Sequence, residues 1–334
     1  MTVPVLEVVD LHIEVPTRRG VLHAVRGVSF TVAPGEALGL VGESGCGKSL
    51  TLRAVLDLLP QPARIVSGSV RVYGVDITEL DPAERRAVIS ASVSMVFQDS
   101  MTALNPLMRI GDQIAEAPQA RLGYSKAAAR ERALALMRQV GIPDPERRAR
   151  AYPHQLSGGL RQRVVIAIAL SCEPRLMLCD EPTTALDVTI QAQVLELLRG
   201  LRRDGDLAML LVTHDLAVVS ETCDRLAVMY AGRVVEDGAI AEMVRDPRHP
   251  YTYCLLRSVP DPELVQQRLL TIEGSPPDLV APVTGCPFAT RCPFREDDCT
   301  ASEPSLLNLT AARHSACHHV QETSSWNAAL QVLT

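Results

Sequence analysis

The chain has 334 residues, 47% of them hydrophobic and 3% aromatic, so it is long enough for a main domain with an appendage and its core must be largely aliphatic. Its net charge of -6 argues against nucleic acid as the main partner, because nucleic-acid-binding domains usually carry a basic patch. No run approaches the ~18 apolar residues of a membrane span and there is no secretory signal, so we expect a cytoplasmic chain. Because the cytoplasm is reducing, we do not expect the nine cysteines to form a disulfide framework.

The first elements are strands rich in Val and Ile, predicted at Leu6–Val15 and Val28–Val32. A third strand is predicted at Ala37–Val41, a short apolar run of the kind buried in parallel sheets. It is followed by apolar residues at helical spacing, which predict a helix at Lys48–Leu59.

The turn between this strand and this helix fits the pattern G-x-x-x-x-G-K-[ST], and the strand before it and the helix after it are the context that the pattern requires. Its residues are Gly42, Glu43, Ser44, Gly45, Cys46, Gly47, Lys48 and Ser49. Glycines let backbone N–H groups converge on an anion, and the helix N-terminus adds a partial positive charge. Lys48 can reach the β- and γ-phosphates of a nucleotide, and the Ser49 hydroxyl can bind Mg²⁺.

A strand predicted at Ser92–Phe97 precedes a stretch, 98–162, that is mostly helical and rich in Ala, Arg and Glu. We expect this stretch to be a helical insertion between two halves of a sheet domain. A helix at Ser157–Leu170 begins with a serine cap followed by Gly158 and Gly159, which makes its start a second candidate anion site.

The remaining strands and helices alternate, which predicts an α/β fold with a largely parallel sheet. They are expected as strands at Leu176–Cys179, Met209–Val212, Leu226–Met229 and Val234–Glu236, and as a helix at Val188–Leu201. The first of these strands ends in two acids. Asp180 is placed to hold Mg²⁺ beside the glycine-rich loop, and Glu181 is placed to polarise an attacking water molecule.

The segment from Leu156 to Leu160 resembles the LSGGQ signature of the ATP-binding cassette (ABC) family, although Leu160 stands where many members have Gln. The resemblance implies a P-loop ATPase in which Ser157, Gly158 and Gly159 close over the ATP held by a partner subunit. An aromatic residue that stacks on adenine in many members is missing from residues 16–20.

Three more segments follow the family's pattern in the same order. Gln98 resembles the Q-loop glutamine, which binds Mg²⁺ and water and senses the membrane partner. Thr184–Asp187 resembles the D-loop at the dimer interface, and His214 resembles the switch histidine that contacts the γ-phosphate. The resemblance therefore implies Glu181, His214 and Gln98 as catalytic residues, with ATP and Mg²⁺ bound.

Phe97–Pro106, Arg248–Thr252 and Gly285–Phe288 are similar to segments of the ATPase subunits of dipeptide/oligopeptide importers. This resemblance implies a heterodimer with a second ABC ATPase, two membrane permease subunits and an extracytoplasmic solute-binding protein, with the chain peripheral on the cytoplasmic face of the inner (plasma) membrane. Asp99–Pro106 is then expected to receive a coupling helix of the permease. Relatives import nickel or other small solutes, so these stay open as cargo, and a soluble ABC ATPase outside transport is the remaining alternative.

We expect three parts: a P-loop ATPase core (1–97 and 163–245), a helical signature subdomain (98–162) and a Cys-rich C-terminal region (246–334). Cys286, Cys292, Cys299 and Cys317 lie in the last part, separated by five, six and seventeen residues. Thiolates can hold Zn²⁺ or an iron–sulfur cluster, and zinc sites usually pair their ligands at closer C-x₂₋₄-C spacing. The resemblance implies a [4Fe–4S] cluster, which some importer ATPases carry in this region. Zn²⁺, with His314, His318 or His319 replacing one thiolate, and four free thiols remain the alternatives.

Overall fold

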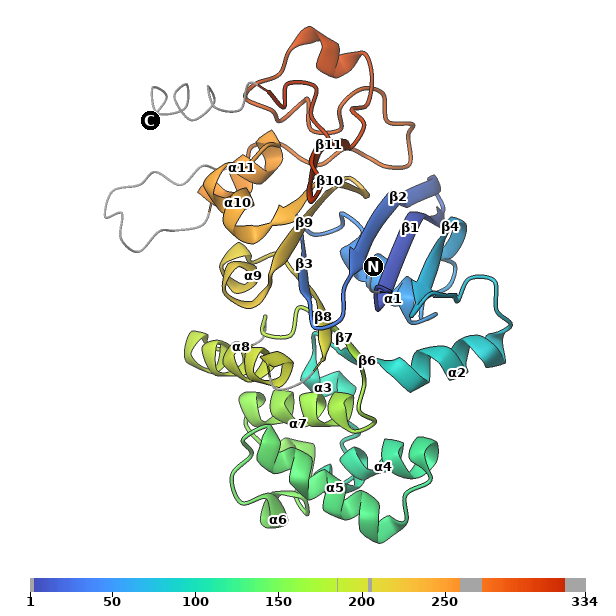
Figure 1. Ribbon diagram of the computed structural model, residues 1–334, viewed down its shortest axis with the longest axis vertical. Coiled ribbons are helices and arrows are strands. Elements are labelled where there is room, and N and C mark those ends of the chain that lie inside the picture. The colour runs from blue at the N-terminus through green and yellow to red at the C-terminus, as the bar shows by residue number, and fades with distance from the viewer. Residues whose placement is uncertain (1–2, 185, 204–205, 259–271, 322–334) are drawn as a thin grey trace. The chain divides into compact units, whose positions relative to one another are not determined.

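The computed structural model describes residues 3–184, 186–203, 206–258 and 272–321 (Figure 1). The chain divides into two compact units. Among the described residues, the first unit contains those up to Leu6, Val32–Glu36 and Val72–Leu211, and the second contains Glu7–Thr31, Ala37–Arg71 and those from Val212 onward. Each unit is thus built from segments that are far apart in the sequence.

The sheet of the first unit has the strand order β8-β7-β6. These strands are β6 (Val93–Val96), β7 (Leu176–Asp180) and β8 (Ala208–Thr213, whose last two residues belong to the second unit). β6 and β7 are parallel, with Val93 opposite Leu176, as the alternation of strands and helices predicted. Every residue of β7 and β8 is buried, which explains why their sequences are uninterrupted apolar runs.

Helix α7 (Gly158–Leu170) lies at the centre of the first unit and contacts α3, α4, α5, α8 and β6 (Figure 1). Ser157 caps it, since its Oγ accepts a hydrogen bond from the Leu160 N–H at 3.4 Å. The other elements of this unit are β5 (Val75–Asp76), α2 (Pro82–Ser92), α3 (Ser100–Ala103), α4 (Ile110–Leu122), α5 (Lys126–Gln139), α6 (Pro145–Arg148), the 3₁₀ turn η1 (Pro153–Gln155) and α8 (Val188–Arg203).

The second unit contains strands of two sheets. One has the order β2-β1-β4, with β1 (Leu6–Thr17), β2 (Gly20–Val32) and β4 (Arg64–Val72). The other has the order β11-β12-β10-β9-β3, with β3 (Ala37–Val41), β9 (Arg225–Tyr230), β10 (Arg233–Ala239), β11 (Leu307–Thr310) and β12 (Arg313–Ser315). β3 and β9 are parallel, whereas β10 is antiparallel to both of its neighbours. The helices are α1 (Lys48–Val55), α9 (Leu216–Thr222), α10 (Ile240–Arg245), α11 (Pro250–Arg257) and the 3₁₀ turn η2 (Asp297–Thr300).

Helix α1 is shorter than the sequence pattern predicted, because it ends at Val55 instead of Leu59. Asp57 adopts a left-handed conformation with φ of 56°. Its N–H bonds the Ala54 carbonyl, and the Leu58 N–H bonds the Arg53 carbonyl. This pair of bonds is the Schellman arrangement that terminates helices, so the apolar spacing continues past the point where the backbone leaves the helix.

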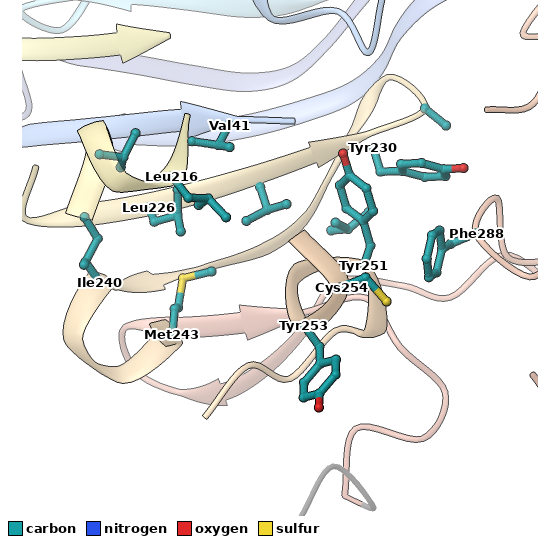
Figure 2. Packing of buried hydrophobic residues seen from close by; sticks show 14 of the residues in the cluster. Val41, Leu216, Leu226, Tyr230, Ile240, Met243, Tyr251, Tyr253, Cys254 and Phe288 are labelled. Atoms are coloured by element: carbon teal, nitrogen blue, oxygen red, sulfur yellow. The ribbon is translucent and has the colours of Figure 1, made fainter. Parts of the chain in front are cut away.

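The C-terminal segment of the described chain shares its core with the sheet of the second unit (Figure 2). Phe288 is 1% exposed and contacts Tyr230 and Tyr251 edge-on, with ring centroids 5.3 and 5.4 Å away. Tyr230 and Tyr251 are themselves 4.6 Å apart. Aromatic contacts of this kind add to the stabilisation from burial, so this segment is anchored by packing on β9 and α11.

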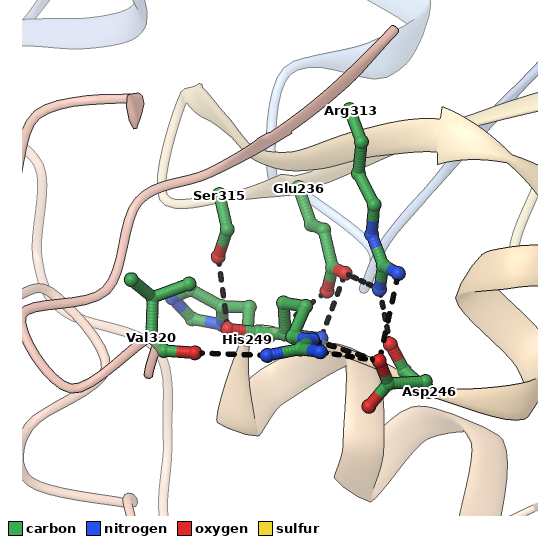
Figure 3. A network of polar contacts seen from close by, with 7 residues as sticks. Glu236, Asp246, His249, Arg313, Ser315 and Val320 are labelled. Atoms are coloured by element: carbon green, nitrogen blue, oxygen red, sulfur yellow. Dashed lines mark hydrogen bonds and ion pairs between the residues drawn. The ribbon is translucent and has the colours of Figure 1, made fainter. Parts of the chain in front are cut away.

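A buried polar network fixes the same segment at the edge of the sheet (Figure 3). Glu236 on β10 accepts hydrogen bonds from the backbone N–H groups of Arg248 and His249, at 2.8 and 2.9 Å. It also pairs with the guanidinium of Arg313 on β12 at 3.0 Å. One carboxylate thereby joins β10, β12 and the start of α11.

Candidate functional site

The glycine-rich loop lies between β3 and α1, where the sequence predicted it. Gly47 has φ of 105°, and a Cβ there would lie 2.6 Å from the Ala24 carbonyl oxygen. At Gly42 a Cβ would lie 2.1 Å from the Met229 carbonyl oxygen. Neither position can therefore carry a side chain, and the loop backbone lies close to β2 and β9. Side chains at these two positions thus do not cover the N–H groups of the loop.

Lys48, the first residue of α1, is held inside this loop and is 5% exposed. Its ammonium donates hydrogen bonds to the carbonyl oxygens of Gly42 at 2.7 Å and Glu43 at 3.0 Å. A buried ammonium needs such acceptors, and these two come from the loop itself. The result is a positive charge fixed at the N-terminus of a helix, which suits a phosphate group.

Glu43 is attached to the rest of the second unit through residues that the sequence analysis did not assign to the site. Its N–H donates a hydrogen bond to the Tyr251 hydroxyl at 2.8 Å. Its carboxylate pairs with Arg291. Tyr251 is also 0% exposed, so its ring packs the start of α11 onto the core of the second unit while its hydroxyl reaches the loop.

Two of the predicted catalytic residues meet in the first unit. Glu181 follows β7, and its Oε2 accepts hydrogen bonds from the Gln98 side-chain amide at 2.9 Å and from the Thr184 hydroxyl at 3.0 Å. Glu181 also has φ of 46°, a conformation that non-glycine residues rarely adopt. Strain of this kind persists where the surroundings hold a side chain in one place, as they do in functional sites. Asp180, at the end of β7, is 5% exposed.

The signature segment is also in the first unit, at the start of α7. Ser157 is exposed, whereas Gly159 is buried, and a Cβ on Gly159 would lie 2.5 Å from Ile190 of α8. The glycine therefore lets α7 and α8 approach closely. In the D-loop motif, Asp187 accepts a hydrogen bond from the Ile190 N–H at 3.0 Å, while Ala185 lies outside the described residues.

His214 follows β8 in the second unit and is exposed. The structure thus groups the loop residues, Lys48 and His214 in one unit, and Gln98, Ser157–Gly159, Asp180 and Glu181 in the other. Within each unit the residues predicted to act together lie at the ends of neighbouring strands or at helix starts, where backbone N–H groups and side chains are available to a ligand.

The four predicted metal-binding cysteines line one narrow space in the second unit, beside His249 and Phe288. Burial raises the pKa of the Cys292 and Cys317 thiols to about 12, and the neighbouring cysteines contribute to the rise. In the part of the chain that the structure describes, the one group of three ligating atoms within 4.8 Å of one another comprises Asp298, Cys299 and His319, so it shares Cys299 with the four cysteines. Among the described residues, no helix has the length and apolar character needed to cross a bilayer.

Two family models match the chain. Residues 25–184 match the ABC transporter model, and residues 235–299 match the model for the C-terminal region of oligopeptide/dipeptide transporters. The chain is 50% identical over 301 residues to the dipeptide transport ATP-binding protein DppD of Bacillus subtilis, an alignment that covers 90% of each chain. It is 46% identical over 296 residues to DppD of Escherichia coli, covering 89% of this chain and 90% of that protein.

A solved structure has a similar fold. It is a dimeric ATP-binding cassette in a post-hydrolysis state, bound to ADP and Pi. Its TM-score is 0.63 at 27% sequence identity, and the match covers 70% of this chain and 98% of that one.

Proposed function

The chain belongs to the ABC transporter ATPases, in the group that has an oligopeptide/dipeptide transporter C-terminal region, and we propose that its ATP hydrolysis drives the uptake of di- or oligopeptides through a membrane permease. The observation that carries this proposal is the presence, in one chain, of a P-loop with its lysine in place and a C-terminal region of the peptide-transporter type. Two relatives that align over 90% and 89% of this chain are dipeptide transport ATP-binding proteins.

ATP is proposed to bind with its phosphates on the loop from Gly42 to Ser49. The buried ammonium of Lys48 and the N–H groups at the start of α1 supply positive charge there. Ser49 and Asp180, with Gln98, are the proposed ligands of Mg²⁺, which would neutralise phosphate charge. An oxygen-rich set of this kind suits Mg²⁺.

Glu181 is the proposed general base for the attacking water. Its hydrogen bonds from Gln98 and Thr184 hold the carboxylate in one position, as a group that takes a proton from a bound water must be held. His214 is proposed to contact the γ-phosphate, and Ser157, Gly158 and Gly159 to contact the γ-phosphate held by a second ATPase subunit.

The proposed assembly is a heterodimer with a second ABC ATPase, two permease subunits and an extracytoplasmic solute-binding protein, on the cytoplasmic face of the inner membrane. Within the chain we propose 1–97 with 163–245 as the ATPase core, 98–162 as the signature subdomain and 246–334 as the C-terminal region. Val188, beside the D-loop, is 84% exposed, which suits an apolar residue that a partner subunit covers.

The segment after Gln98 is the proposed contact for the permease. Met101 is 56% exposed and Leu107 is 85% exposed, whereas Leu104 is buried at 2%. Exposed apolar residues in one short segment favour a protein partner. Asn105 fixes the backbone between them, because it exchanges hydrogen bonds with Gln113 of α4. The contact surface is therefore Met101 and Leu107, and Leu104 supports it from within.

We propose that the four cysteines of the C-terminal region hold a [4Fe–4S] cluster, which would act as a structural cross-link. All four line the same space. Four sulfurs bound to one zinc ion at about 2.3 Å lie only about 3.8 Å apart. No three of these thiols in the described chain lie within 4.8 Å of one another, a spacing that favours a bulkier cluster over zinc.

The cluster proposal is tested by the metal content of anaerobically purified protein. We expect a brown protein with about four irons per chain. Cys292→Ser should lower the iron content, while Cys172→Ser, a free cysteine of the first unit, should not. Stoichiometric zinc in a colourless preparation would favour the Asp298, Cys299 and His319 group, and no metal at all would leave free thiols.

The transport proposal is tested with the complex reconstituted in proteoliposomes. ATP inside the vesicles should drive accumulation of a labelled dipeptide in the presence of the solute-binding protein. A complex that accumulates Ni²⁺ but no peptide would replace the proposed cargo, and a complex that hydrolyses ATP but accumulates no solute would favour a role outside transport.

A further inference from the structure

Arg291, which lies beside Cys292 in the C-terminal region, uses all of its hydrogen-bond donors inside the second unit. Nη1 donates to Glu43 Oε2 at 2.8 Å and to the Tyr230 hydroxyl at 3.2 Å. Nη2 donates to Glu43 Oε1 at 2.9 Å and to the Ile272 carbonyl at 3.2 Å. Nε donates to the Glu273 carbonyl at 3.0 Å. A guanidinium has five N–H groups, and each has an acceptor here.

This side chain is enclosed, with 4% of its surface exposed. Its guanidinium lies over the rings of Tyr230 and Phe288, 5.8 and 6.0 Å from their centroids. Only a planar fork can pair with both carboxylate oxygens of Glu43 and still fit between two rings. The surroundings are therefore built for arginine and not for positive charge alone.

Glu43 belongs to the P-loop, and its three polar groups are all fixed. Its N–H is bonded to Tyr251, its carboxylate to Arg291, and its carbonyl to the ammonium of Lys48. A shift of Glu43 would therefore move one of the two carbonyl oxygens that hold Lys48. Arg291 is 248 residues away in the sequence, yet it reaches the phosphate-binding loop through this one residue.

We propose that Arg291 is a positioning residue for nucleotide binding, which acts through Glu43 to hold the P-loop in its binding-competent conformation. The inference rests on the proposed binding of ATP at this loop. It makes the affinity for nucleotide depend on the fold of the C-terminal region around Cys292 and Phe288. Without the fork, Glu43 and Lys48 would populate several conformations, and the apparent affinity would fall by the fraction that remains competent.

The test is equilibrium binding of a fluorescent, non-hydrolysed ATP analogue with Mg²⁺ to the full chain. Arg291→Lys keeps the charge and loses the fork, and Glu43→Gln removes the charge from the other side while it leaves the C-terminal region unchanged. We expect each to weaken binding by about 10- to 100-fold, the range for losing charge-assisted hydrogen bonds. If Arg291 acts through Glu43, the double variant should bind about as weakly as either single variant.

Arg313→Lys is the matched control. It alters the buried pair that Arg313 of the same C-terminal region forms with Glu236 of β10, 7% and 0% exposed, which does not involve the loop. It should lower thermal stability and leave the affinity within about twofold of wild type. Wild-type affinity in Arg291→Lys, multiplicative losses in the double variant, or an equal loss in Arg313→Lys would each overturn the inference. A wild-type chain that fails to bind the analogue would instead overturn the proposed ATP site itself.

Discussion

Replacing Glu236 with glutamine should destabilise the second unit more than most single substitutions. The Glu236 side chain is fully buried, and its two oxygens accept from the N–H groups of Arg248 and His249 and from the Arg313 guanidinium (Figure 3). In Glu236→Gln one of these oxygens becomes an NH₂ group. That group would face a donor it cannot accept from, and the Arg313 cation would keep only the Asp246 carboxylate, 3.9 Å away, as an ionic partner.

The size of the effect follows from these contacts. Removing one partner of a buried ion pair costs about 3–5 kcal/mol, because the other charge stays buried and unpaired. Leaving one buried backbone N–H without an acceptor costs about 1–3 kcal/mol, and the two losses overlap because the same network rearranges. We therefore expect a loss of about 4 kcal/mol, a large fraction of the roughly 5–15 kcal/mol that stabilises a typical protein.

The assay is urea denaturation of the purified chain, followed by circular dichroism. Glu196→Gln is the control, since it makes the same chemical change on the surface, where Glu196 pairs with Arg199 and Arg203. The control should stay within about 0.5 kcal/mol of wild type. A Glu236→Gln protein within about 1 kcal/mol of wild type would refute the reasoning, because the network would then contribute no more than a surface pair.

Two more predictions concern His249 and Leu107. Burial lowers the pKa of His249 to about 3, whereas an unfolded imidazole titrates near about 6.5, so only the unfolded chain takes up this proton as the pH falls. The contribution of His249 to the free energy of unfolding is therefore complete above about pH 6.5 and declines below it. Between about pH 7.5 and 5.5, urea denaturation should show wild type losing about 1.4 kcal/mol more of its unfolding free energy than His249→Asn. Equal losses in the two proteins would contradict the burial argument. In reconstituted complexes, Leu107→Ser should lower the rate of permease-stimulated ATP hydrolysis by about tenfold without changing the basal rate, as expected for an interface anchor. Leu122→Ser, at another exposed apolar position, is the control. An unchanged stimulated rate in Leu107→Ser would remove the proposed contact.

The parts of the site that could be predicted from the sequence are those fixed by local structure. The P-loop follows a fully buried strand and opens a helix, so its pattern and its context lie within a few residues of each other. Glu181 and Gln98 were predicted separately, each at the end of a strand, and β6 and β7 are neighbours in the sheet, which brings the two side chains together.

The contacts that the sequence did not predict are made across long separations. Arg291 and Tyr251 contact Glu43 through tertiary packing, and no periodicity or spacing marks an arginine as the partner of one glutamate. The strands β11 and β12 are four and three residues long, too short for a period-2 pattern, and they form because β10 offers an edge for pairing. Helix α1 ends early for a similar reason, since the left-handed conformation of Asp57 has no signal in its apolar pattern.

The central claim is that the chain hydrolyses ATP, with Lys48 holding the phosphates and Glu181 activating the water. The most direct test measures both steady-state ATP turnover and ATP binding in two variants. Glu181→Gln should lose turnover by about 100-fold or more, the contribution of a general base, and still bind ATP. Lys48→Ala should lose both, because it removes the charge that the loop holds for the phosphates. Near-wild-type hydrolysis by Glu181→Gln would contradict the account.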